Sequence, residues 1–296
     1  MDKSIKSVLI TGATGFLGSH LTKCFLNLNY RVIILIRSSS NLFRIKDYTP
    51  IPIIYNIDKE ELSDIFHNEK PDIVIHSACN YGKENTPLID VIKTNLVFGL
   101  DVFEQACLNK TNFFINIDTS LPKTINNYSL SKAQFKEWLK LDSRIKISNI
   151  RIDLIYGAND NQNTFLSKLI NSMKSNSKQK IKLTSGLQKR DFIYVTDVVD
   201  AIKIIVKKEH LLDHYSEIDI TTGRFVMVKD FIEKIISKLE SKSQILIKKR
   251  LGFGEISYRN DEIMEPSLSG SFIKAFGWTP KVTHEEGILK ILEQYK

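Results

Sequence analysis

The 296-residue sequence predicts an α/β protein built on a doubly wound parallel sheet, and two observations support this fold class. First, short apolar runs alternate with amphipathic stretches, which is the rhythm of repeated strand–helix–strand units. Second, the runs are almost continuous Ile and Val, which suits strands buried on both faces. The expected strands are 8–10, 32–36, 51–54, 73–75, 113–115 and 145–150, with helices near 16–28, 59–68, 88–109 and 129–141.

The rhythm changes after Tyr156-Gly157, where loops and scattered helices replace the regular alternation. A smaller, mixed α/β lobe is therefore expected at the C-terminal side. The predicted division gives residues 1–160 to the parallel-sheet domain and 161–296 mainly to the second lobe. Segments near 190–222 are expected to return to the first domain.

The composition narrows the class of protein. Hydrophobic residues make up 42% of the chain, and 13 glycines and 7 prolines are too few for a fibrous or disordered protein. The three cysteines fit neither a disulfide framework nor a zinc pattern. No apolar stretch approaches the length of a membrane span, and no secretory signal is recognised at the first residues. The lysines behind the net charge of +8 are dispersed. We expect a cytoplasmic protein with no metal and with neither nucleic acid nor a membrane as partner.

The segment Thr11–Gly18 is a glycine-rich turn between the first expected strand and the first helix. Gly12, Gly15 and Gly18 permit a tight turn and a close backbone approach, and the helix N-terminus can then face a pyrophosphate. The context indicates a dinucleotide-binding, Rossmann-type domain. The alternative is a strand–helix turn that is merely rich in glycine.

The end of the second strand bears on the choice of dinucleotide. An acidic residue there would bind the ribose hydroxyls of NAD, but this sequence reads Ile36-Arg37-Ser38. An arginine beside hydroxyls suits a 2′-phosphate, so NADP (NADPH) is favoured. The alternative is that Arg37 is a solvated strand end.

Tyr128 directly precedes the expected helix 129–141, and Lys132 lies one helical turn further along. Both follow soon after the strand-end pair Thr119-Ser120. A cation beside a phenol stabilises the phenolate, so we expect a proton donor of lowered pKa. The alternative is an ordinary Tyr and Lys on a helix surface.

These motifs resemble those of the extended short-chain dehydrogenase/reductases (SDRs) of the NAD-dependent epimerase/dehydratase type, which act on nucleotide sugars. The resemblance rests on Thr11–Gly18, the Tyr128/Lys132 pair and Arg190–Asp197, and it spans essentially the whole chain. Further matches are His76-Ser77-Ala78, Asn95, Gly277–Pro280 and Glu286-Gly287. Within this family, Asn116–Ser120 and Arg259–Met264 look most like the CDP-abequose synthases and related 4-ketoreductases.

The resemblance implies a role for each matching position. Tyr128 would protonate the substrate carbonyl, Lys132 would hold the nicotinamide ribose and tune the phenol, and Thr119 would bind the substrate oxygen, with Ser120 as the second choice. Arg190 and Arg259 would grip the substrate diphosphate, Tyr81 would line the substrate site, and His76 would be structural. The implied cofactor-binding residues are Gly12, Thr14, Gly15, Phe16, Leu17, Gly18, Arg37, Ser38, Asn56, Ile57, Asp58, Ser77, Ala78, Asn95 and Lys132.

The implied reaction is NADPH-dependent reduction of the 4-keto group of a nucleotide-diphosphate-linked 4-keto-6-deoxy or 3,6-dideoxy sugar, for surface polysaccharide synthesis. Alternatives are an NAD-dependent nucleotide-sugar epimerase, a dehydrogenase of a non-nucleotide substrate and a non-catalytic NADP-binding scaffold. The family's dimer surface would fall on helices 88–109 and 129–141, which predicts a homodimer. Residues 121–127 form a shorter substrate loop than is usual in the family, so the resemblance does not imply which sugar is the substrate.

Overall fold

The computed structural model describes residues 5–82, 86–162, 164–175 and 179–294. The chain divides into two compact units, and each unit is built from two stretches of sequence. The first unit comprises Met1–Ile152 and Val199–Asp219, and the second comprises Asp153–Val198 and Ile220–Lys296.

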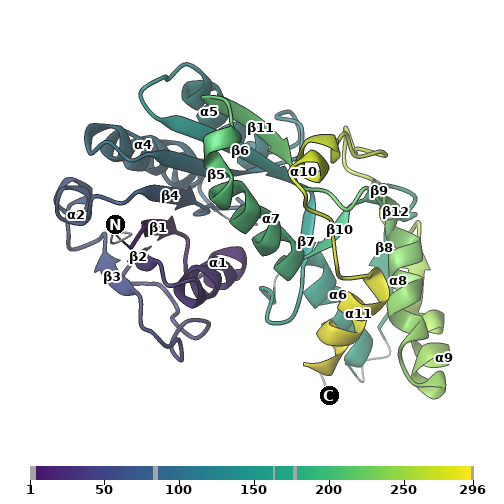
Figure 1. The fold of residues 1–296 in the computed structure, drawn as a ribbon. Helices are drawn as coiled ribbons and strands as arrows, with labels where there is room; N and C mark the ends of the chain where they lie inside the picture. Colours follow the sequence, from purple (N-terminus) through teal and green to yellow (C-terminus); the bar gives the residue numbers. More distant parts are fainter. Residues whose placement is uncertain (1–4, 83–85, 163, 176–178, 295–296) are drawn as a thin grey trace. The chain divides into compact units, whose positions relative to one another are not determined.

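The first unit is organised around a parallel sheet of seven strands within the described residues (Figure 1). Its strand order is β11-β6-β5-β4-β1-β2-β3, and every neighbouring pair runs parallel. This order confirms the predicted Rossmann-type, doubly wound sheet. The strands are β1 (Ser7–Thr11), β2 (Arg31–Ile36), β3 (Ile53–Asn56), β4 (Ile73–His76), β5 (Phe113–Thr119), β6 (Lys146–Ile152) and β11 (Tyr215–Asp219).

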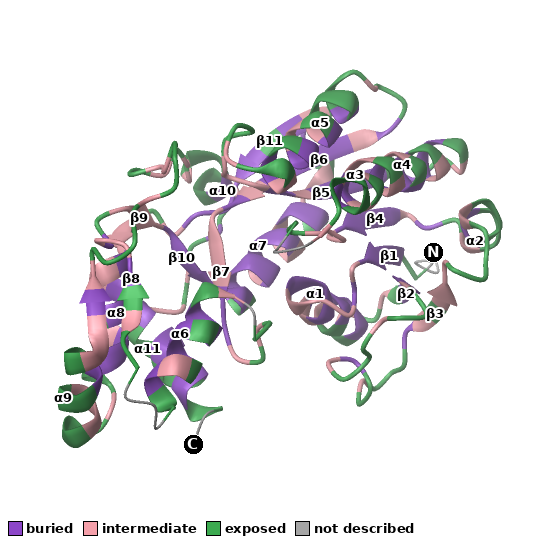
Figure 2. Ribbon diagram, turned by 180° about the vertical axis from the view of Figure 1, so that it is seen from behind, coloured by how far each residue is buried: buried purple, intermediate pink, exposed green. Residues whose placement is uncertain are grey.

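Helices cover both faces of this sheet, which explains why its central strands are buried throughout (Figure 2). One face packs against α2 (Leu62–Glu69), α4 (Phe98–Leu108) and α5 (Asn127–Lys140). The core of that face includes Leu9, Val74, Phe114, Phe66, Phe103 and Phe135. The other face carries α1 (Phe16–Asn27) and the part of α7 (Val195–Lys207) that belongs to this unit.

The helix expected over 88–109 is interrupted in the structure. It consists of α3 (Leu88–Ile92), a π-helical segment η1 (Lys93–Val97) and α4. The wider π turn lies at Asn95, whose side chain is fully buried. Such turns are frequent at functional sites, and a pattern of apolar residues does not reveal them.

The second unit is a smaller mixed α/β assembly. Its described strands pair as β7 (Leu154–Tyr156) with β10 (Phe192–Tyr194), β9 (Lys189–Arg190) with β12 (Val226–Met227), and β8 (Ile181–Leu183) with β13 (Leu251–Phe253). Its helices are α6 (Phe165–Lys174), α8 (Val228–Ser237), α9 (Ser241–Arg250), α10 (Ser271–Ala275) and α11 (His284–Glu293). The remaining short helix, η2 (Glu209–Leu211), belongs to the first unit.

Aromatic packing holds the second unit together. The Phe192 and Phe231 rings stack with centroids 3.7 Å apart, and the Tyr156 ring meets both edge-on. Gly287 lets α11 approach this cluster, because a Cβ there would lie 2.1 Å from the Tyr156 hydroxyl. The family motif Glu286-Gly287 therefore has a packing reason in this chain.

Candidate active site

The site predicted from sequence begins at one edge of the parallel sheet. Because all strands of the sheet run the same way, their carboxyl ends share that edge. Thr11, His76 and Thr119 end β1, β4 and β5 there, and Arg37 follows β2 directly. Ligands of open α/β sheets bind outside this edge.

The glycine turn after β1 is shaped by contacts that leave no room for side chains. Gly12 has a φ of +67°, and a Cβ on it would lie 2.7 Å from the backbone nitrogen of Ala78. A Cβ on Gly18 would lie 2.1 Å from the Gly12 carbonyl oxygen, and the Gly15 N–H donates to that same oxygen at 2.9 Å. The backbone of the turn is thus packed directly onto the first turn of α1 and onto the chain after β4.

The N-terminus of α1 is suited to an anion. Gly15 is its N-cap and supplies no side-chain cap, and the described first turn carries no acidic residue. Thr14 lies in the turn itself, and Phe16 and Leu17 begin the helix. Free N–H groups and the helix dipole together favour a phosphate at this point, so these residues fit a dinucleotide pyrophosphate.

The second half of a dinucleotide site lies at the ends of β2 and β3, where Ile36 pairs with Asn56. Ser38 joins the two strand ends, since its N–H donates to the Asp58 carboxylate at 2.7 Å and its hydroxyl accepts from the Asn56 amide at 3.1 Å. The Ile57 N–H donates to the Ile36 carbonyl at 3.0 Å. Arg37 is exposed beside this cluster.

The end of β4 is tied to the end of β1. The Ser77 hydroxyl donates to the Thr11 carbonyl at 2.7 Å, and the Ala78 N–H donates to the Thr11 hydroxyl at 3.2 Å. The Thr11 hydroxyl also lies 3.0 Å from Nδ1 of the fully buried His76. Burial, and then the charge of Lys132, lowers the pKa of His76 to about 3, so the imidazole is neutral. This supports a structural role for His76.

The structure joins Tyr128 to Thr119 and buries Lys132 one turn further along the same helix. Helix α5 begins with a capping box between Asn126 and Ser129, which fixes the helix start beside Tyr128. A side-chain hydrogen bond joins Tyr128 to Thr119. Lys132 is almost completely buried on the same helix, and its Nζ donates to Oδ1 of Asn116 at 3.3 Å.

The expected lowering of the Tyr128 pKa by Lys132 is wrong for this structure. Burial is the largest influence and raises the pKa of the phenol well above its usual value, and only the hydrogen bond with Thr119 lowers it. Burial also lowers the pKa of the Lys132 ammonium, against the opposing charge of Asp118. The Lys132 ammonium is directed to Asn116, which helical spacing alone did not indicate.

A loop after β4 lies beside the phenol. The Tyr81 ring packs 5.0 Å from the Tyr128 ring, centroid to centroid. Cys79, which the sequence analysis did not single out, interacts electrostatically with both Tyr128 and Lys132. Its position just past the end of β4 was the signal that could have placed it at this edge of the sheet.

Asn95 holds this loop from inside. Its amide oxygen accepts from the Asn80 N–H at 2.6 Å, and its amide nitrogen donates to the Asn80 carbonyl at 2.8 Å and to the Ser131 hydroxyl at 3.0 Å. Because Asn95 is fully buried, its direct partners are this loop and α5.

Ser120, at the end of β5, is anchored by its N–H, which donates to the Ile152 carbonyl at 3.0 Å.

In the second unit, Arg190 and Arg259 meet on a carboxylate that the sequence interpretation missed. The Arg190 guanidinium pairs with Glu262 and donates to the Ile263 carbonyl at 2.8 Å. Nε of Arg259 lies 2.8 Å from Oε2 of the same Glu262. Arg190 does not pair with its neighbour Asp191, which instead accepts hydrogen bonds from Thr222.

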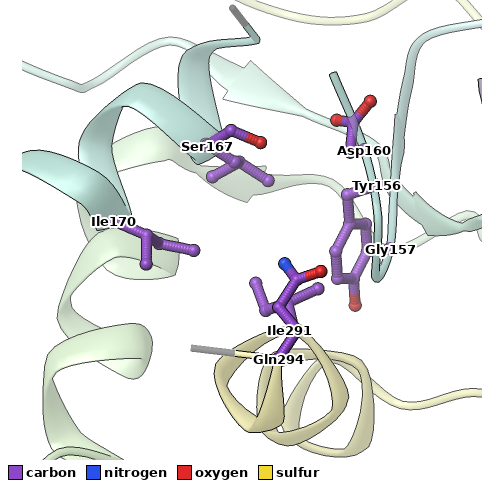
Figure 3. Close-up of a pocket in the computed structure, with 8 residues that line it drawn as sticks. Tyr156, Gly157, Asp160, Ser167, Ile170, Ile291 and Gln294 are labelled. Carbon is purple, nitrogen blue, oxygen red and sulfur yellow. The ribbon is translucent and has the colours of Figure 1, made fainter. Parts of the chain in front are cut away.

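A small pocket of the second unit lies apart from these predicted residues (Figure 3). Tyr156, Asp160, Ser167 and Gln294 contribute its polar groups, and none of them was predicted to carry chemistry. Within the described ranges, no cluster of three His, Cys, Asp or Glu side chains could hold a metal ion. No helix in that part of the chain is long and apolar enough to cross a bilayer.

A glycine turn, a strand-end threonine and a Tyr–Lys pair on one edge of a parallel sheet define an SDR-type enzyme. A family model described as the NAD dependent epimerase/dehydratase family matches residues 8–220, and the chain belongs to that family. It is 30% identical to a CDP-abequose synthase of Salmonella muenchen, over 97% of both chains. It is also 24% identical to a putative UDP-glucose 4-epimerase of Methanocaldococcus jannaschii, over 98% of both.

Solved structures share the fold. A UDP-glucose 4-epimerase of Thermotoga maritima with bound UDP-glucose superposes with a TM-score of 0.80 at 21% identity, covering 98% of each chain. An enzyme of Bordetella bronchiseptica in complex with NAD+ gives 0.81 at 19% identity, again covering 98% of each. Nucleotide-sugar chemistry and a nicotinamide cofactor are thus properties of the chain's relatives.

Proposed function

We propose that the protein reduces the 4-keto group of a nucleotide-diphosphate-linked 4-keto-6-deoxy or 3,6-dideoxy sugar with NADPH, for surface polysaccharide synthesis. The observation that carries the proposal is the hydrogen-bonded group of Thr119 and Tyr128 with Lys132 on the same helix turn. NADPH, when bound, supplies the hydride. The full-length match to a CDP-abequose synthase supports a deoxysugar substrate.

Tyr128 is the proposed proton donor to the carbonyl oxygen. The phenol carries its proton at neutral pH, but burial raises its pKa and makes it a weaker acid than a free phenol, so the role needs a group that stabilises the phenolate. Thr119 holds the phenol and, in this proposal, hydrogen-bonds the same substrate oxygen. Lys132 is the proposed donor to the nicotinamide ribose, and its buried ammonium favours the phenolate that remains after proton transfer.

The preference for NADPH over NADH is attributed to Arg37 and Ser38. A guanidinium and hydroxyls at the end of β2 offer charge-assisted donors to a 2′-phosphate. The Ser38 hydroxyl accepts from the Asn56 amide, so it keeps its own hydrogen to donate. Gly12, Gly15, Ser77 and Ala78 would line the path of the rest of the dinucleotide.

Arg190 and Arg259 are the proposed ligands of the substrate diphosphate. Guanidinium groups bind phosphate oxygens with paired donors. Glu262 pairs with both arginines, so the carboxylate holds the two guanidinium groups close to one another until the diphosphate exchanges with it. Tyr81 and Ser120 complete the proposed substrate contacts. A homodimer through α3, α4 and α5 remains a prediction.

The test is NADPH consumption with a panel of CDP-, dTDP-, GDP- and UDP-linked 4-keto-6-deoxy sugars, with the product configuration read by NMR. We expect turnover with at least one sugar and a higher kcat/KM with NADPH than with NADH. The protein as purified is analysed for bound cofactor in parallel. Stoichiometric, tightly held NAD together with interconversion of 4-epimers would contradict the reductase proposal and identify an epimerase.

A further inference from the structure

A chain of buried polar side chains connects Lys132 to a carboxylate on the sheet. Nζ of Lys132 donates to Oδ1 of Asn116 at 3.3 Å, and Nδ2 of Asn116 donates to Oδ1 of Asn149 at 2.6 Å. Nδ2 of Asn149 then donates to Oδ2 of Asp118 at 2.8 Å. The second oxygen of Asp118 accepts from the Thr119 N–H at 2.8 Å. We refer to Asn116, Asn149 and Asp118 as the relay.

The relay occupies the centre of the sheet, where apolar side chains are the rule. Asn116 and Asn149 face each other across β5 and β6 and are fully buried, and Asp118 is 6% exposed. Burying a polar group costs free energy unless its hydrogen bonds are made, and a buried charge costs more, because its desolvation is large even when it is paired. Three such side chains in succession are difficult to explain by stability alone.

The relay has a fixed direction. An ionised carboxylate can only accept hydrogen bonds, so Asp118 makes Asn149 present its amide nitrogen. The Asn149 oxygen must then face Asn116, and the Asn116 oxygen must face the ammonium. A carboxylate at one end thus determines that an acceptor, not a donor, meets Lys132 at the other.

We propose that Asp118 is a positioning residue for the proposed reduction: through Asn149 and Asn116 it keeps Lys132 charged and in place, and through the Thr119 N–H it fixes the end of β5. The inference rests on the proposed roles of Lys132 and Thr119. It adds that those roles depend on a carboxylate that touches neither substrate nor cofactor.

Other charged and titratable groups surround the two ends of the relay. Lys132 interacts with His76 and Cys79 from the β4 side. Asp118 interacts with Tyr128 from α5, with Arg151 from β6 and with Tyr215 from β11. Arg151 is already paired with Asp219 at 2.7 Å, so it does not take over the role of counter-ion to Asp118. His76 is neutral, and of the two groups that oppose the lowering of the Lys132 pKa by burial, Asp118 acts more strongly than Cys79.

The test is an NMR titration of the full-length protein labelled at lysine 13Cε, with the Lys132 signal assigned by its loss in Lys132→Met. We expect Asp118→Asn to lower the proton affinity of Lys132 by up to about tenfold, because an opposite charge within about 4–6 Å shifts a pKa by about one to three units and two asparagine side chains separate this pair. The matched control, Asp90→Asn, removes the same charge from an exposed position on α3 and should leave the titration unchanged. An Asp118→Asn titration identical to wild type would overturn the proposal.

A second variant covers the case in which Asp118→Asn does not fold. Asn116→Ser removes the oxygen that meets the ammonium while leaving Asp118 and Asn149 paired. It too should lower the proton affinity of Lys132, and an unchanged value would overturn the relay. This readout needs no turnover, so it stands even if the sugar panel shows no reductase activity. If turnover is found, the alkaline limb of its pH profile should move to lower pH in both variants.

Discussion

Replacing Gly18 by Ala places a methyl carbon 2.1 Å from the Gly12 carbonyl oxygen, where ordinary contact begins at 3.4 Å. The obstacle is backbone, so the clash is relieved only if α1 and the glycine turn separate by about 1.3 Å, the difference between these two distances. Overpacking of this kind costs about 1–3 kcal/mol, and a displacement of about 1 Å can cost roughly a hundredfold in a positioned site. We therefore expect Gly18→Ala to weaken NADPH binding about tenfold to a hundredfold.

The assay is titration of NADPH fluorescence against wild type, Gly18→Ala and the matched variant Gly99→Ala. Gly99 also lies in a helix, but a Cβ there would meet the ring of Phe135 at 3.1 Å, and a side chain can adjust. Gly99→Ala should bind NADPH within about twofold of wild type. Alanine favours a helix by about 1 kcal/mol over glycine, which offsets part of the destabilisation caused by the clash. We therefore expect Gly18→Ala to change the free energy of NADPH binding more than the free energy of unfolding. Wild-type affinity in Gly18→Ala would refute the reasoning.

Three further outcomes are expected. Tyr128→Phe should lose about two to four powers of ten in kcat while its NADPH affinity stays within about twofold, measured beside the control Tyr30→Phe at the opposite, amino end of β2; turnover above a tenth of wild type would contradict the proton-donor role. Arg37→Asp should weaken NADPH, but not NADH, by about tenfold to a hundredfold, because a charge-assisted bond contributes about 1.5–3 kcal/mol; equal losses for both cofactors would argue against 2′-phosphate binding. The pKa of the His76 imidazole is about 3 in the folded chain and 6.5 for the unperturbed group. At a pH between these two values the unfolded state binds a proton that the folded state does not, so acid favours unfolding. Stability should consequently fall by about 2 kcal/mol between pH 7 and pH 5 through this group, and urea unfolding of His76→Asn should lack that part of the pH dependence.

Local sequence patterns predicted the buried parallel strands and the glycine turn of the first unit. The apolar runs around Val8–Ile10 and Ile73–Ile75 predicted buried parallel strands. The glycine residues predicted a turn between the first strand and the first helix, and the structure has that turn between β1 and α1. Fold class could be read in this way because a strand buried on both faces has a composition of its own.

The parts that sequence did not predict depend on which residues face each other after folding. Glu262 lies far along the chain from Arg190, and no local pattern linked the two. Asn149 meets Asn116 only through the register of β5 and β6. The pKa of Tyr128 was expected in the wrong direction, because helical spacing indicates that Lys132 is near but not where its ammonium points or how deeply the phenol is buried.

The discontinuous first unit has a consequence for biosynthesis. Strand β6 is complete when Ile152 has been made, but its outer neighbour β11 follows only when Asp219 has been made. A growing chain on the ribosome therefore carries an unpaired strand edge while the whole of Asp153–Val198 is being synthesised. That interval is when association between nascent chains is most favoured, and chaperone capture would be most useful then. Truncation after Ile152 would make the same exposed edge permanent.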